Sequence, residues 1–236
     1  MNLNAPLTDK ANALECLDFC QKDYGSTTIK TQSAHFNIDQ LPDCLVVSAR
    51  GSWSAEDWMT DSDFLMCDTI YGSLHTGFWE STNTIIPMIH QALRSLPSLP
   101  VIVTGHSLGG DQACITALDL VMSRFPVHQV ITFGQARPGG SDYKTFYDSK
   151  LGSQTARWVD ARDIVPRLPF ANLGYANVGQ ELFLPSSGGM EMNPTFMELF
   201  HDDVVGTLID VKSGRCNLIT DHTLEHYRAR INALTP

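Results

Sequence analysis

Ser107 is the residue of this sequence that is best placed to act as a nucleophile. It stands at the centre of residues 105–109 (Gly-His-Ser-Leu-Gly), after an apolar run at 101–103 and before a helical pattern at 112–125. A sharp turn from strand to helix raises a serine hydroxyl above the end of the strand, and it needs glycine on both sides because flanking side chains would collide. The turn also directs the N–H of Leu108 at an acyl oxygen bound beside the serine. The pattern predicts acyl transfer.

A serine hydroxyl ionises poorly near neutral pH, so Ser107 needs a histidine base and a carboxylate that orients the histidine. In hydrolases built on such an elbow, the acid and then the histidine follow the serine along the chain. Two acids follow a predicted strand, Asp160 and Asp163. Pro166 ends the extended segment after Asp163, so a loop can carry this carboxylate to the site, but both acids remain candidates.

Four histidines follow the elbow, namely His128, His201, His222 and His226. His128 precedes a predicted strand, which places it at the wrong edge of the sheet. His201 lies beside two aspartates and suits a solvated loop better than a metal site. His222 stands before the last predicted helix, from where its side chain can reach back over the sheet. His226 lies one helical turn further and is expected to serve packing or the surface, so His222 is the preferred base.

The elements that must position these groups alternate between strand and helix. Beyond the elbow, we predict helices at 8–22, capped by Thr8, and at 80–96, kinked by Pro87, and strands at 44–49, 64–69, 128–134, 156–159 and 180–184. This order predicts an α/β fold with a mostly parallel sheet, helices on both faces and its chemistry at the carboxyl ends of the strands. A length of 236 residues with 43% hydrophobic content fits one such domain.

The composition narrows the range of possible binding partners. A formal net charge of −10 argues against nucleic acid and against anionic membranes, and favours neutral substrates. No stretch approaches the ~20 apolar residues that span a bilayer, and residues 1–8 lack the features of an export signal. We therefore slightly favour a cytoplasmic protein, with a secreted mature form as the alternative. The six cysteines (Cys16, Cys20, Cys44, Cys67, Cys114 and Cys216) are expected to be free thiols.

Six ordered blocks between residues 46 and 227 resemble the class 3 lipase family, which includes fungal triacylglycerol lipases, feruloyl esterases and plant acylhydrolases. The blocks are residues 50–52 with 57–58, 75–78, 104–110, 132–135 with Arg137, 163–169, and 221–222 with Tyr227. The resemblance implies an α/β-hydrolase fold. It also implies Ser107 as nucleophile, Asp163 as acid and His222 as base, with an oxyanion hole from Ser52 and Leu108 and neither metal nor cofactor.

Residues 53–64 correspond to the lid over the site in the family's pattern. If this segment is helical, Trp58 and Met59 share an apolar face opposite acidic residues. Together with Trp53 they are the predicted lid and substrate-binding residues. The alternative is a surface helix whose tryptophan packs permanently on the body of the protein.

We expect a monomeric triacylglycerol lipase that works through an acyl-enzyme, with acylglycerols or other esters as substrate and a lipid–water interface as a further partner. The alternatives are a carboxylesterase for soluble short-chain or aromatic esters, a phospholipase A1-type acylhydrolase, and a non-catalytic binding domain.

The sequence departs from the family's pattern in four places. Asp111 stands where alanine is usual, Ala136 and Pro138 replace proline and valine, and Asn177 lies where histidine is common. We expect the helix dipole to stabilise the Asp111 carboxylate, which would raise the pKa of a nearby histidine. The departures concern the shape of the acyl or leaving-group pocket rather than the reaction.

Overall fold

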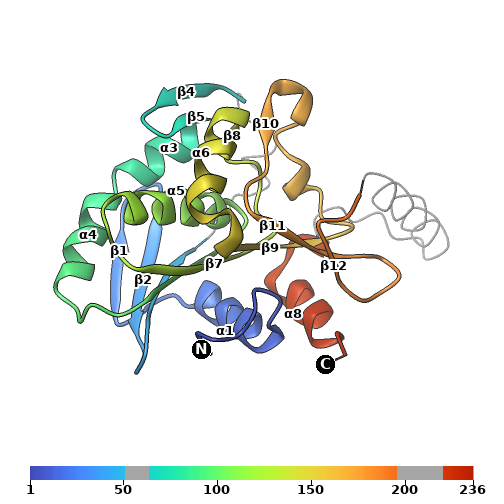
Figure 1. The fold of residues 1–236 in the computed structure, drawn as a ribbon, viewed down its shortest axis with the longest axis horizontal. Helices are drawn as coiled ribbons and strands as arrows, with labels where there is room; N and C mark the ends of the chain where they lie inside the picture. Colours follow the sequence, from blue (N-terminus) through green and yellow to red (C-terminus); the bar gives the residue numbers. More distant parts are fainter. Residues whose placement is uncertain (51–63, 196–219, 236) are drawn as a thin grey trace.

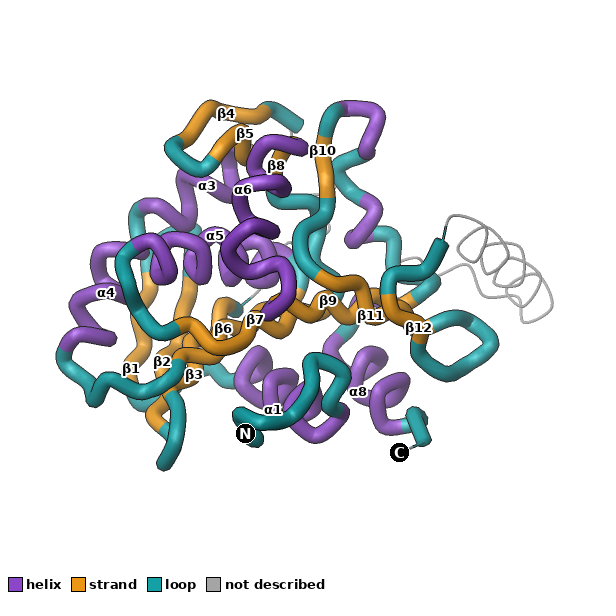
Figure 2. Tube along the Cα trace, in the orientation of Figure 1, coloured by secondary structure: helices purple, strands orange, loops and turns teal. Residues whose placement is uncertain are grey.

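An eight-stranded sheet forms the centre of the computed structural model, which describes residues 1–50, 64–195 and 220–235 (Figures 1 and 2). Its strands, in spatial order, are β1 (Thr27–Lys30), β2 (His35–Gln40), β3 (Leu45–Ala49), β6 (Val101–His106), β7 (Val127–Phe133), β9 (Thr155–Asp160), β11 (Gln180–Leu184) and β12 (Glu191–Met192). The five strands from β3 to β11 are parallel, and the strands at both edges are antiparallel. The prediction of a mostly parallel sheet is confirmed.

Helices cover both faces of this sheet, as predicted. Figure 1 shows α3, α4, α5 and α6 on one face and α1 and α8 on the other. Their bounds are α1 (Lys10–Gln21), α3 (Thr76–Asn83), α4 (Ile86–Arg94), α5 (Leu108–Met122), α6 (Ser141–Leu151) and α8 (Leu224–Asn232). Each face has its own apolar core, because parallel strands covered on both sides are buried on both.

A smaller antiparallel sheet lies beyond α3 and α6, away from the large sheet (Figure 1). Its strands, in spatial order, are β10 (Tyr175–Ala176), β8 (Gly139–Gly140), β5 (Gly72–His75) and β4 (Met66–Thr69). The segment predicted as a strand at 64–69 therefore belongs to this sheet and not to the central one.

Two helix predictions need correction. The first helix begins at Lys10, and its N-cap is Asp9, whose carboxylate accepts a hydrogen bond from the N–H of Asn12 (2.7 Å), rather than Thr8. The predicted helix at 80–96 is two helices. Pro87 lies in the first turn of α4, where its missing N–H costs nothing, so it starts a helix instead of kinking one.

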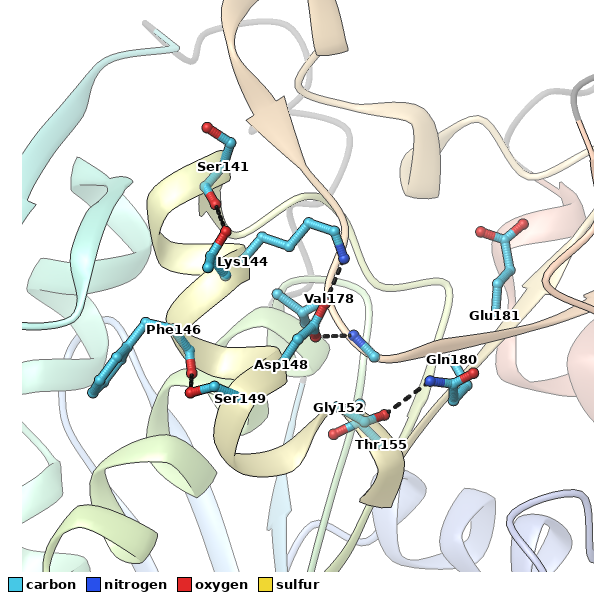
Figure 3. A network of polar contacts seen from close by, with 12 residues as sticks. Ser141, Lys144, Phe146, Asp148, Ser149, Gly152, Thr155, Val178, Gln180 and Glu181 are labelled. Carbon is cyan, nitrogen blue, oxygen red and sulfur yellow. Dashed lines mark hydrogen bonds and ion pairs between the residues drawn. The ribbon is translucent and has the colours of Figure 1, made fainter.

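Polar contacts fix α6 against the chain that enters β11 (Figure 3). The Asp148 carboxylate accepts a hydrogen bond from the N–H of Gly179 (2.7 Å) and contacts Lys144, one turn earlier in α6. The side-chain amide of Gln180 donates to the carbonyl of Gly152 (3.2 Å), in the short helix η1 (Gly152–Gln154). These contacts set the position of β11 beside β9.

The first and last described helices lie side by side on the face opposite α5 (Figure 1). The ammonium of Lys10 donates to the carbonyls of Asn232 and Leu234, both at 2.8 Å. Arg228 of α8 pairs with Asp18 of α1 at 2.6 Å. Contacts between residues more than 200 positions apart thus hold α8 in place.

Five cysteines (Cys16, Cys20, Cys44, Cys67 and Cys114) are free, as predicted, and Cys216 lies outside the described residues. Burial raises the pKa of Cys20 and of Cys114 to about 12, so both thiols stay protonated near neutral pH. Within the described ranges, no helix has the length and apolar character needed to cross a bilayer.

Candidate active site

The turn between β6 and α5 holds Ser107 in a strained conformation. Its φ of 58° and ψ of −133° are unusual for a residue with a side chain, and its N–H donates to the carbonyl of Phe133 (3.0 Å). A Cβ at Gly105 would lie 2.1 Å from the backbone carbonyl oxygen of Gly109, so the turn can close in this shape only with glycine at position 105. Leu108 begins α5 directly after the serine, which leaves its N–H unused by the helix.

His222 and Asp163 form a buried pair. His222 ends the short helix η4 (Thr220–His222), and Asp163 lies in the loop after β9. The imidazole Nδ1 is 2.8 Å from Asp163 Oδ2, and the two residues are 6% and 0% exposed. Because the carboxylate can only accept, Nδ1 carries the proton and Nε2 is left as the basic nitrogen. Nε2 has no hydrogen-bond partner within the part of the chain that the structure describes.

Two contacts near Ser107 place the His222–Asp163 pair at the edge of the sheet where Ser107 lies. His106, which precedes Ser107, has its Nε2 2.6 Å from the carbonyl oxygen of His222, and the two rings lie 4.7 Å apart. Gly134 follows Phe133, the residue that binds the Ser107 N–H. A Cβ on Gly134 would lie 2.9 Å from His222 Nδ1 and 2.7 Å from Asp163 Oδ2. The structure therefore brings His222 and Asp163 together at the end of the strand that leads to Ser107.

Burial sets the charge of the groups around the pair. It lowers the pKa of His106 to about 3, so this imidazole is neutral and its Nε2–H donates to the carbonyl of His222. Burial and the nearby Asp163 raise the pKa of Tyr227 well above its usual value. The Tyr227 hydroxyl therefore stays protonated, and it donates to Asp163 Oδ2 at 2.7 Å.

The alternative acid and the remaining histidines have other partners. Asp160 pairs with Arg230 (2.9 Å) and lies 3.4 Å from His226, so Asp163 and not Asp160 meets His222. His128 contacts the carbonyl of Leu3 (2.8 Å) near the start of β7, the end of the sheet away from Ser107. The predicted residues Ser52, Trp53, Trp58 and Met59, and also His201, lie outside the described residues.

Three residues of the site were given no role by the sequence argument. His106 and Gly134 stand inside matching blocks, but only the fold shows that they contact His222. Tyr227 lies five residues after His222, on the turn of α8 that faces the loop of Asp163. The sequence offered one signal for it, because Tyr227 belongs to the same matching block as the predicted base.

Asp111 differs from the expectation of a carboxylate stabilised by the helix dipole. It is 0% exposed, and burial raises its pKa well above the usual value. No well-formed hydrogen bond to either carboxyl oxygen is present among the described residues, although the nearby N–H groups of Ala136 and of Asp111 itself lower the pKa. At this position the cost of desolvation exceeds the benefit of the dipole.

Comparisons with known proteins agree with this geometry. A family model described as Lipase (class 3) matches residues 46–173, more than half of the chain. The secreted mono- and diacylglycerol lipase A of Penicillium cyclopium is 25% identical over 77% of this chain and 61% of its own length. The secreted mono- and diacylglycerol lipase 1 of Fusarium solani is 33% identical over 70% of this chain and 51% of its own. The chain thus spans only about half to three fifths of these relatives.

A solved structure described as a triacylglycerol lipase, with a serine protease triad as its catalytic centre, has a similar fold. Its TM-score is 0.63 at 25% identity, and the match covers 75% of this chain and 78% of that one. The predicted α/β-hydrolase fold is thereby confirmed.

The expected cytoplasmic location is wrong. Relatives from Penicillium cyclopium and Fusarium solani are named secreted lipases, which points to an extracellular location instead.

Proposed function

Because the chain belongs to the class 3 lipase family, we propose that it is a serine hydrolase that cleaves acylglycerol esters. The buried His222–Asp163 pair beside the strained Ser107 is the observation that carries this proposal. A neutral imidazole with an oriented Nδ1–H and a free Nε2 is the base that a serine nucleophile needs.

The reaction begins when His222 Nε2 takes the proton of the Ser107 hydroxyl as its oxygen attacks the ester carbonyl. The N–H of Leu108 at the start of α5 stabilises the oxyanion, and we assign the second donor to Ser52. His222 then gives its proton to the leaving alcohol, and an acyl-enzyme forms. The same imidazole activates water, which releases the acid and restores Ser107. Asp163 fixes the tautomer of His222 and stabilises the imidazolium.

Exposed apolar side chains support a lipid substrate over a soluble ester. Leu65 is 62% exposed, directly before β4, while Phe170 and Leu173 are 50% and 49% exposed around the short helix η3 (Ala171–Leu173). The Tyr175 hydroxyl donates to the carbonyl of Leu65 (3.3 Å), which brings these two segments together. Such a surface suits contact with the apolar face of a lipid droplet. Like its named relatives, the protein would then act on mono-, di- or triacylglycerols.

The same proposal includes one α/β-hydrolase domain, a monomeric state, and residues 53–64 as a lid whose Trp53, Trp58 and Met59 contact the acyl chain. The family's pattern and the apolar spacing of this segment support it.

Replacement of the serine tests the chemistry. We expect Ser107→Ala to lower kcat by about 10⁴-fold or more and to abolish labelling by a fluorophosphonate probe. Ser149→Ala is the matched control, because Ser149 is an exposed serine whose hydroxyl donates to the carbonyl of Phe146 in its own helix. Labelling that persists in Ser107→Ala, or a wild-type protein that neither reacts with the probe nor cleaves esters, would overturn the proposal.

A series of esters tests the substrate class. A lipase should show a sharp rise in rate once the substrate exceeds its solubility and forms droplets, with long acyl chains accepted. Simple saturation by soluble short-chain or aromatic esters, without a response to droplets, would instead indicate a carboxylesterase.

A further inference from the structure

A charged cluster outside the site joins the two segments that carry Asp163 and His222. His226 lies in its middle. Its Nε2 is 3.4 Å from Asp160 Oδ2, and its Nδ1 is 3.5 Å from Asp221 Oδ1. Asp160 is buried, while His226 and Asp221 are partly exposed. The imidazole therefore faces one carboxylate with each of its nitrogens.

Each of the two carboxylates belongs to a segment of the site. Asp160 is the last residue of β9, and its backbone carbonyl accepts a hydrogen bond from the N–H of Asp163 (3.1 Å). Asp221 directly precedes His222 in η4. A cation between Asp160 and Asp221 thus ties the turn that holds the acid to the short helix that holds the base.

We propose that His226, in its protonated form, is a positioning residue that bridges Asp160 and Asp221 and thereby keeps His222 aligned with Asp163 and Ser107. This inference rests on the proposed function, because it assigns His226 a role through the imidazole of His222. His226 itself touches neither substrate nor the reacting atoms.

The charges around His226 favour its protonated form. Its pKa is raised, first by its polar contact with Asp160 at 3.4 Å and further by the charges of Asp160 and Asp221, against the opposing effects of burial and of Arg230. Arg230 of α8 also lies beside the cluster, with its Nε 2.9 Å from Asp160 Oδ2. The bridge is therefore complete at low pH and is lost as the pH rises through the raised pKa of His226.

Asp160, Asp221 and His226 also offer three atoms within 4.8 Å of one another, which is close enough for a metal ion. The guanidinium of Arg230 already contacts the buried carboxylate, so the protein's own cations supply the positive charge. We therefore assign the cluster to a bridge between side chains, and an effect of a divalent cation on it would contradict this assignment.

The pH profile of kcat separates this role from mere structural support. The bridge is lost as the pH rises through the raised pKa of His226, so its loss lowers kcat on the alkaline side of the profile. We expect His226→Gln to lower kcat by about 10-fold with little change in KM, since the imidazole of His222 is misplaced rather than the substrate. In this variant, the fall of kcat at alkaline pH that is due to His226 should vanish from the pH profile. Asp221→Asn should have the same effect.

His90→Gln is the matched control. His90 of α4 also pairs with an aspartate, Asp119, at 2.7 Å, but this pair lies away from the site. The His90 variant should keep the wild-type pH profile. Wild-type kcat and an unchanged profile in both His226→Gln and Asp221→Asn would overturn the inference.

Two measurements that do not require ester cleavage distinguish failure of this inference from failure of the proposed function. In the Ser107→Ala background, NMR titration should show His226 with a raised pKa that falls in Asp221→Asn. The loss of stability in His226→Gln should be largest at low pH and shrink as the pH rises. An unshifted His226 pKa would refute the bridge even in a protein that cleaves esters. The bridge would also be refuted if Ca²⁺ or EDTA changed the melting temperature and Asp221→Asn abolished that change.

Discussion

Asp163 accepts more hydrogen bonds than a carboxylate needs for orienting an imidazole. Its Oδ2 accepts from both His222 Nδ1 (2.8 Å) and the Tyr227 hydroxyl (2.7 Å), while its Oδ1 accepts from the N–H of Val165 (2.9 Å). The Tyr227 oxygen also accepts from the N–H of Asp160 (3.1 Å). One buried hydroxyl thus links the acid to the end of β9.

Removal of that hydroxyl should weaken both the site and the fold. We expect Tyr227→Phe to lower kcat by about 10-fold, since the carboxylate is held less firmly. It should also reduce the free energy of unfolding by about 1.5–3 kcal/mol, because a hydrogen bond to a buried charge is lost. Steady-state kinetics and urea unfolding measure the two effects, and a variant that matches the wild type in both would show that the hydroxyl is dispensable.

Asp111 is a residue whose replacement should stabilise the protein. Its pKa is raised by burial, so the folded state holds the proton more tightly than the unfolded state, and stability falls as the pH rises above the ordinary value of 3.8. We expect Asp111→Ala to raise the free energy of unfolding near pH 8 by about 1–3 kcal/mol. The gain should shrink towards acid pH.

Replacement of Asp119, in the same helix as Asp111, should have the opposite effect on stability. Its carboxylate accepts from the Tyr71 hydroxyl (2.5 Å) and pairs with His90, so Asp119→Ala should destabilise the protein by about 1–3 kcal/mol. Chemical denaturation over a range of pH compares the two variants. A pH-independent change in Asp111→Ala would refute the burial of an unpartnered acid.

At the scale of elements, the turn after β7 forms the wall behind the imidazole of His222. Gly134 has a φ of +55°, and its N–H donates to the carbonyl of Trp158 (3.0 Å). The next residue, Gln135, accepts from the Thr132 hydroxyl (2.7 Å) and the Cys114 thiol (3.2 Å) of α5. The helix that begins directly after Ser107 thus also holds the turn against which His222 rests.

A single methyl group should disrupt this wall. We expect Gly134→Ala to lower kcat by about 10²-fold, because its Cβ would lie within 3 Å of both His222 and Asp163. Gly188→Ala is a matched control with a positive φ of 96° and no atom near the added Cβ. It should cost about 1 kcal/mol of stability and leave kcat unchanged. Equal effects of the two substitutions on kcat would show that the clash is relieved.

The elements that could be predicted from the sequence are those whose own residues and nearest neighbours mark them as strand or helix. β6 begins with the apolar run 101–103, β11 ends with the apolar run 182–184, and the elbow glycines mark the start of α5, so all three were found. The hairpin of β1 and β2 was missed. Its strands mix polar and apolar residues, and they are held by pairing with each other and with β3, which a single sequence does not reveal.

The same distinction applies to the site. Ser107 stands in a local motif, while His222 and Asp163 could be ranked by chain order and by resemblance. The hydroxyl of Tyr227, the ring of His106 and the bridge through His226 depend on where α8 docks, and that is a property of the folded chain.

For the whole molecule, the net charge of −10 governs how it meets a surface. Apolar contact through the exposed side chains near β4 and η3 needs no attraction between charges, and anionic lipid should repel an acidic protein. We expect the inactive Ser107→Ala protein to co-sediment with zwitterionic vesicles at least as well as with anionic ones. A strong preference for anionic vesicles that salt abolishes would show that a local basic surface, and not the overall charge, directs binding.

The pairing of the first and last described helices has a consequence for biosynthesis. The ribosome makes Ser107 and all five parallel strands before it makes His222, and α8 must then dock on a helix translated some 200 residues earlier. Such closure between remote parts of a polypeptide is slow compared with local folding. A nascent chain therefore carries Ser107 before it carries His222, and the proposed triad is completed only after most of the polypeptide has been translated.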